Sequence, residues 1–222
     1  MNTLTHHVIA SRLISQIHPT NPAEYLWGSI YPDIRYPAKL RRETTHLPLE
    51  QLQEWISRYP DQSSFLTGYL VHCLVDKIDG ARLLLKAFPL VLFKPLLKNK
   101  FSLHLAHVVI ELFLIQTEAL PCQLDMVYLP DLTHPPIPEA LVNSYFTASH
   151  AYLASPSIET GLRLFKSFGL LEDSRLEKYL KAYHALQENR LMQAILFWSV
   201  RNARIVPQAC QSVLKQMQAS HT

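Results

Sequence analysis

Long helical patterns with almost no glycine dominate this chain. Only 5 of its 222 residues are Gly, whereas Leu, Ala, Gln, Glu and Lys recur with the spacing of helix faces. This periodicity predicts helices over about 4–17, 23–29, 49–59, 63–88, 101–120, 139–154, 157–168, 173–187 and 189–218. Residues 31–48 carry three prolines and are expected to form an ordered loop, and Pro207 is expected to kink the last helix. With no β-hairpin pattern and no internal repeat, the sequence predicts an all-α fold.

The length and charge of the chain favour one domain over residues 1–222. A chain of this size buries roughly 70% of its unfolded surface, which is enough for one core. The net charge of +3 comes without a dense Lys/Arg run, so duplex nucleic acid is not an expected partner. Three widely spaced cysteines do not form a disulfide framework.

Neither an export signal nor a membrane span is expected. The first seventeen residues include two His and an Arg and lack a continuous apolar stretch. The most apolar segment, 83–97, is interrupted by two lysines and two prolines and falls short of the ~20 residues that span a bilayer. These features predict a cytoplasmic protein with free thiols.

Two otherwise apolar helices carry a His and a carboxylate four residues apart. His72 and Asp76 lie in GYLVHCLVD, and His107 and Glu111 lie in HLAHVVIE. On a helix such pairs share one face, and an ionised carboxylate buried there needs a cationic partner. Either basic side chains neutralise these carboxylates, or a divalent metal lies between the helices. A single pair of this kind is more often an ordinary hydrogen bond, but two pairs favour the metal.

Other residues of metal-ligand type lie upstream. His6 and His7 are on the first helix, Asp33 follows Pro32 in a turn, and His46 ends the proline-rich loop. Gly68 and Gly80 lie one turn from His72 and Asp76, where the missing side chains leave room for a close helix or a ligand.

The same loop carries four basic residues. Arg35, Lys39, Arg41 and Arg42 are either a solvated face or a landing site for an anionic substrate. Arg35 and Arg41 are the substrate-binding candidates.

This set of features resembles the zinc-dependent phospholipase C family, which is all-helical and related to the fungal single-strand-specific nucleases. The resemblance runs through about residues 1–115. It consists of an early His, a G-x-x-x-P-D turn, the His of TTHLP, and the patterns G-Y-L-V-H-x-x-x-D and H-x-x-x-E. It implies a metal-site half over about residues 1–120, followed by additional C-terminal helices over about 121–222.

The resemblance also implies a ligand set for one to three zinc ions. Asp33, His46, His72 and Asp76 would hold the first zinc. Asp76 would bridge to a second zinc that His6 also binds, and His107 and Glu111 would belong to a third. A water activated by these ions would attack a phosphoric ester, with Asp33 as the acceptor of its proton.

The chain departs from the family pattern at three points. Exported members use a processed amino terminus as a ligand, whereas this sequence begins with Met1 followed by Asn2. Arg82 stands where the family has a further His, for which His104 is the candidate replacement. The expected cytoplasmic location also separates the chain from secreted lipases and nucleases.

The sequence therefore predicts a metal-dependent hydrolase of phosphoric esters, similar to phospholipase C, that acts on a phospholipid or a small phosphodiester. The alternative is a non-enzymatic helical protein with a degenerate metal site that serves as an interaction or membrane-surface module. In that case segment 83–97 would provide a peripheral membrane contact. Nuclease action on single strands ranks below both.

Overall fold

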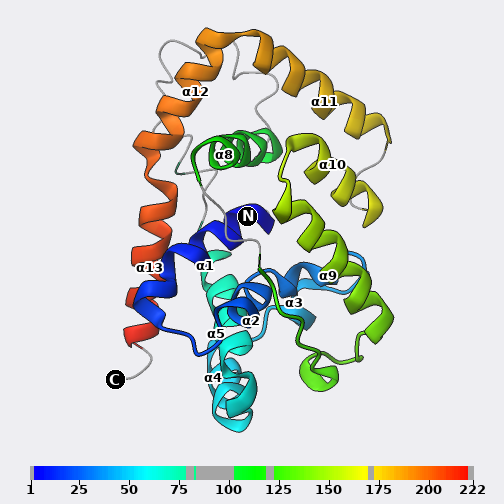
Figure 1. Ribbon diagram of the computed structural model, residues 1–222, viewed down its shortest axis with the longest axis vertical. Helices are drawn as coiled ribbons and strands as arrows, with labels where there is room; N and C mark the ends of the chain where they lie inside the picture. The colour runs from blue at the N-terminus through cyan, green and yellow to red at the C-terminus, as the bar shows by residue number, and fades with distance from the viewer. Residues whose placement is uncertain (1–2, 79–82, 84–102, 119–122, 170–172, 220–222) are drawn as a thin grey trace.

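All regular structure in the computed structural model is helical over the residues that it describes: 3–78, 83, 103–118, 123–169 and 173–219 (Figure 1). This confirms the predicted all-α class. The α-helices are α1 (Thr3–Ile17), α2 (Pro22–Gly28), α3 (Arg42–Thr45), α4 (Leu49–Arg58), α5 (Ser63–Val75), α8 (Leu103–Thr117), α9 (Glu139–Ala154), α10 (Ile158–Ser167), α11 (Asp173–Glu188), α12 (Arg190–Ala203) and α13 (Ile205–Ala219). Short 3₁₀ turns are η1 (Tyr31–Arg35), η2 (Pro60–Gln62) and η3 (Pro130–Leu132).

Two glycines allow α2 and α5 to cross with their backbones in contact. A Cβ atom added to Gly68 would lie 1.9 Å from the carbonyl oxygen of Tyr25, and one added to Gly28 would lie 1.9 Å from that of Phe65. Any larger residue would push the two backbones apart, because both obstacles are main-chain atoms. The predicted room around Gly68 is therefore filled by a neighbouring helix.

An aromatic cluster supports the turn that follows α2. The ring of Trp27 packs edge-on against Tyr31, with 5.5 Å between ring centroids, and Trp27 and Tyr31 are both buried. Tyr145, from the distant helix α9, donates a hydrogen bond of 2.9 Å to the carbonyl oxygen of Ile30. Packing and hydrogen bonding together hold η1 at a defined place beside α5.

Helix α1 connects the α2–α5 pair with other parts of the bundle. Helix α1 contacts α5, α8 and α13, and α8 also packs on α12, so the nearly uncharged α8 lies inside the bundle. Helices α12 and α13 run along one edge of the molecule (Figure 1). Among the described residues, no helix combines the length and apolarity needed to cross a bilayer.

Helix α5 is shorter than predicted. It ends at Val75, where the periodicity predicted a helix to residue 88; residues 79–82 and 84–88 lie outside the described part of the chain. The Asp76 N–H still bonds to the carbonyl of His72, but the next two N–H groups bond to carbonyls three residues back. The helix thus closes as a 3₁₀ turn, and Asp76 is its C-cap.

Two other predictions needed correction. The loop 31–48 is ordered, as expected, but it contains η1 and the short helix α3. The C-terminal helix is broken, not kinked, because Arg204 adopts φ 47° between α12 and α13. Proline lacks an N–H and its ring clashes with the carbonyl four residues earlier, so Pro207 fits only in the first turn of a new helix.

Candidate metal centre

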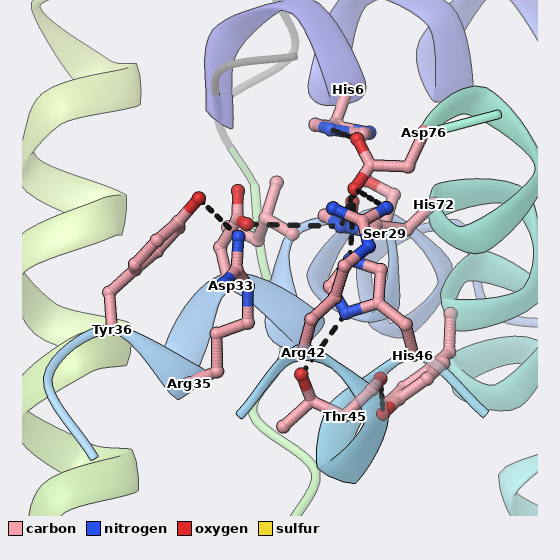
Figure 2. A network of polar contacts seen from close by, with 12 residues as sticks. His6, Ser29, Asp33, Arg35, Tyr36, Arg42, Thr45, His46, His72 and Asp76 are labelled. Atoms are coloured by element: carbon pink, nitrogen blue, oxygen red, sulfur yellow. Dashed lines mark hydrogen bonds and ion pairs between the residues drawn. The ribbon is translucent and has the colours of Figure 1, made fainter. Parts of the chain in front are cut away.

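Five predicted ligand side chains converge in a largely buried cluster (Figure 2). They come from four separate segments: α1, η1, the end of α3, and α5 with its C-cap. The residues are His6, Asp33, His46, His72 and Asp76. They form two overlapping groups, His6–Asp33–His72 and His46–His72–Asp76, and within each group the ligand atoms lie within 4.8 Å of one another. The structure thus brings these five residues together, and their role as metal ligands stays a prediction.

His72 lies at the centre with a defined orientation. Its Nδ1 is 2.8 Å from the carbonyl oxygen of Ser29, and since a carbonyl only accepts, Nδ1 donates. The lone pair of the neutral ring is then on Nε2, which lies 3.9 Å from oxygens of both Asp33 and Asp76. Burial lowers the pKa of His72 well below its ordinary value, and the neighbouring His6 adds to this effect. The ring is therefore held neutral, the form that binds metals.

Asp76 connects three basic side chains at the end of α5. Its Oδ1 lies 3.1 Å from His6 Nε2, and its Oδ2 lies 2.9 Å from His46 Nε2 and 2.6 Å from a terminal nitrogen of Arg42. Burial alone would raise the pKa of Asp76, but the contacts with His46 and His6 hold it below its usual range. Asp76 is therefore a carboxylate at neutral pH.

His6 completes the inner side of the cluster. Its ring stacks on that of His72, with centroids 3.8 Å apart and planes inclined by 11°. Burial lowers the pKa of His6, against the opposing influence of Asp76. Two stacked neutral imidazoles thus line the same space.

Asp33 faces the cluster from η1. Pro32, at the start of η1, fixes φ in this turn, and the Asp33 N–H bonds to the Ile30 carbonyl. Burial, reinforced by the charge of Asp76, raises the pKa of Asp33 to about 7. A carboxyl group that is this costly to ionise gains most from a nearby cation.

The loop histidine is anchored through its neighbour. His46 is the C-cap of α3, and the buried hydroxyl of Tyr69 on α5 donates to the carbonyl oxygen of Thr45. The Thr45 hydroxyl also lies 3.2 Å from His46 Nδ1. These contacts fix α3 against α5 and direct His46 Nε2 toward Asp76.

The donor set fits a zinc ion. His72 Nε2 is buried and has no hydrogen-bond partner among the described residues, although it lies between two carboxylates. At 3.9 Å these oxygens are too distant for hydrogen bonds, whereas two ligands of one tetrahedral zinc lie roughly 3.4 Å apart. Imidazole and carboxylate are ordinary zinc ligands. A cation between these atoms would satisfy a nitrogen that the protein leaves unpaired.

Arg42 belongs to the cluster although it was not among the predicted site residues. Its side chain is 47% exposed, whereas that of Asp76 is 5% exposed, so Arg42 lies on the solvent side of the centre. The sequence signal for it is the spacing, since Arg42 is four residues before His46. In the structure both residues contact the same oxygen of Asp76.

The two predicted substrate-binding residues differ in position. Arg35 lies beside Asp33 and stacks on the Tyr36 ring, 3.8 Å from its centroid, with a further hydrogen bond to the Tyr36 hydroxyl (Figure 2). Arg41 is exposed and lines an open hollow of about 470 Å³ together with Asp131 and His134. Substrate binding by Arg35 and Arg41 stays a prediction.

Among the predicted ligands of a third zinc, the structure describes the side chain of Glu111. Glu111 is buried and accepts a hydrogen bond of 3.3 Å from the Tyr152 hydroxyl on α9, and it is in neither ligand group of the described residues. The side chains of His104 and His107 lie outside the described part of the structure, as do Met1, Gly80 and Arg82. The third site therefore stays a prediction.

Fold and site together define an all-helical protein with a buried His/Asp cluster suited to a divalent metal. Residues 5–78, about a third of the chain, match the family model described as zinc dependent phospholipase C. The match contains all five clustered residues and ends two residues after Asp76. The match and the two ligand groups support a zinc-dependent, phospholipase-like hydrolase at the level of the family only. Comparison with curated proteins and with solved structures gives no match.

Proposed function

We propose that the protein hydrolyses phosphoric esters, with a phospholipid or a small phosphodiester as substrate. The observation that supports this most directly is His72 Nε2, which is buried, unpaired and directed between the carboxylates of Asp33 and Asp76. Building such a cluster without a ligand is unfavourable, because buried polar atoms lose their hydration without compensation.

The five clustered residues would hold the metal. His72 would be shared between the two ligand groups, with His6 and Asp33 on one side and His46 and Asp76 on the other. Bound zinc supplies Lewis acidity for a phosphoryl oxygen and lowers the pKa of a coordinated water to about 7.

The protein's own residues would orient the substrate and accept a proton. Asp33 lies at the edge of the cluster, where its carboxylate can take the proton of the attacking water. Arg42 lies at the solvent side, where its guanidinium can bind two oxygens of an entering phosphate. Arg35 is near enough for its charge to affect Asp33, and would assist at the same phosphate.

Metal analysis combined with an activity assay tests the proposal. Protein purified without chelator is expected to contain at least one zinc per chain and to hydrolyse a chromogenic phosphodiester. His72→Gln should lose both the zinc and the activity, because it removes the imidazole nitrogen that the two ligand groups share. The exposed His184→Gln on α11 is the matched control and should retain both.

Two results would reject the proposal. Folded wild-type protein without zinc after incubation with excess metal would remove its basis. Zinc-loaded protein inactive on phosphodiesters, phosphomonoesters and phospholipids would favour the alternative, an interaction module with a degenerate site. The cytoplasmic location is a separate proposal, which fractionation of cells that express the protein would test.

A further inference from the structure

The last two helices of the chain carry positive charges only. Residues 190–219 include Arg190, Arg201, Arg204 and Lys215 and contain no Asp or Glu. The three arginines are exposed, on α12 and at the break that precedes α13. Within residues 190–219 no acidic side chain offsets these charges, although the net charge of the whole chain is only +3.

Two large apolar side chains are exposed on the same helix. Leu191 is 72% exposed and Trp198 is 55% exposed, and their spacing of seven residues places them on one face of α12. Met126, far from α12 in the sequence, is the other large apolar side chain exposed among the described residues. An exposed Trp and Leu flanked by arginines are typical of a helix that lies in a membrane interface.

An apolar hollow lies beside Arg201 and Arg204. A cavity of about 180 Å³ between α8, α12 and the start of α13 is lined by Ile110, Val200, Arg201 and Arg204, among others. The acidic residue on its wall, Glu118, is already paired with Arg12 at 2.6 Å. The mouth of the cavity thus keeps the positive charge of its two arginines.

We propose that the outer face of α12 with the break that follows it, defined by Arg190, Leu191, Trp198, Arg201 and Arg204, binds the surface of membranes that contain anionic phospholipids. The arginines would contact lipid phosphates, each contributing an attraction equivalent to about fivefold in partitioning. Trp198 and Leu191 would enter the interface, and the adjoining cavity offers apolar surface to an acyl chain.

The charge pattern favours a lipid surface over other partners. A two-fold dimer through this face would place arginines opposite arginines, which is unfavourable. A single-stranded nucleic acid needs several exposed aromatic rings for stacking, whereas Leu191 offers none. The face lies outside residues 5–78, so the inference goes beyond the proposed hydrolytic function.

Vesicle binding tests the inference without any measurement of hydrolysis. Full-length protein should sediment with vesicles of phosphatidylcholine and phosphatidylglycerol, less with pure phosphatidylcholine, and less as salt increases. Its tryptophan emission should shift to the blue. Trp27 is buried and Trp55 partly so, hence the shift should disappear in Trp198→Phe.

Substitutions on this exposed face locate the contact. Trp198→Ala should weaken partitioning about tenfold and Arg201→Gln about fivefold, whereas Met126→Ala should have no effect. Circular dichroism checks that each variant is folded. The inference is wrong if anionic vesicles do not bind the protein, or if binding persists unchanged in Trp198→Ala and Arg201→Gln. Self-association that Trp198→Ala abolishes, without vesicle binding, would instead identify a second copy as the partner.

Discussion

The Nδ1 atom of His72 donates a hydrogen bond of 2.8 Å to the main-chain carbonyl of Ser29, which immediately follows Gly28. Gly28 and Gly68 are also the residues that let α2 and α5 touch. The hydrogen bond that orients the His72 ring thus depends on the close crossing of α2 and α5. A change in the distance between these helices should therefore affect stability and metal binding together.

Gly68→Ala tests this dependence. The new methyl group would meet the Tyr25 carbonyl at 1.9 Å, so the helices must separate, and we expect a loss of about 2 kcal/mol or more in the free energy of unfolding. Zinc affinity should fall as well, because Ser29 moves away from His72. In Gly161→Ala the nearest atom is the Tyr152 hydroxyl at 3.1 Å, a side chain that can adjust, so the effect should be smaller. Equal stability of Gly68→Ala and wild type would contradict the close crossing.

Asp76→Asn removes the negative charge that three basic groups share. We expect zinc affinity to fall by at least about a hundredfold and phosphodiester hydrolysis to be lost, because an amide is a poor zinc ligand. Competition with a chromogenic chelator measures the affinity. Asp61→Asn, at the surface turn η2, makes the same chemical change away from the site and should leave both properties intact. Unchanged affinity in Asp76→Asn would show that Asp76 is not a ligand.

Arg42→Ala should separate substrate binding from metal binding. Since Arg42 contributes no metal ligand, zinc content should be retained while KM for a phosphodiester rises about tenfold. Arg42→Lys should recover only part of the loss, because an ammonium group cannot form the two parallel bonds of a guanidinium. Arg58→Ala, at the end of α4, is the matched control. A lower kcat with unchanged KM would argue against contact between Arg42 and the bound substrate.

Zinc binding should release a proton in mildly acidic solution. The pKa of Asp33 is raised to about 7, so below that pH the metal-free protein holds a proton that a ligand must lose. Asp33 should release about 0.9 proton at pH 6 and about 0.1 at pH 8. His6 and His72 should release few protons when zinc binds, because burial lowers their pKa. Calorimetry in buffers of different ionisation enthalpy measures the count at pH 6, where a zinc-bound water with a pKa of about 7 adds little, and Asp33→Asn should lower that count by about 0.9.

The sequence determined the helices and the identity of the clustered residues. Periodicity depends on side chains within about one turn of each other, so α1, α8 and α9 appear close to their predicted bounds. Ligand-type residues on apolar stretches also stand out without a structure, because unpaired polar groups are costly inside a core. His72 and Asp76 were identified in this way.

Tertiary packing decided how these residues are used. The carbonyl of Ser29 looks like any other in the sequence, and only the crossing of α2 with α5 brings it to His72. The ion pair of Arg42 with Asp76 likewise joins two segments that are distant in the sequence. Local patterns carry no information about such distances, because contacts between remote segments arise only when the whole core packs.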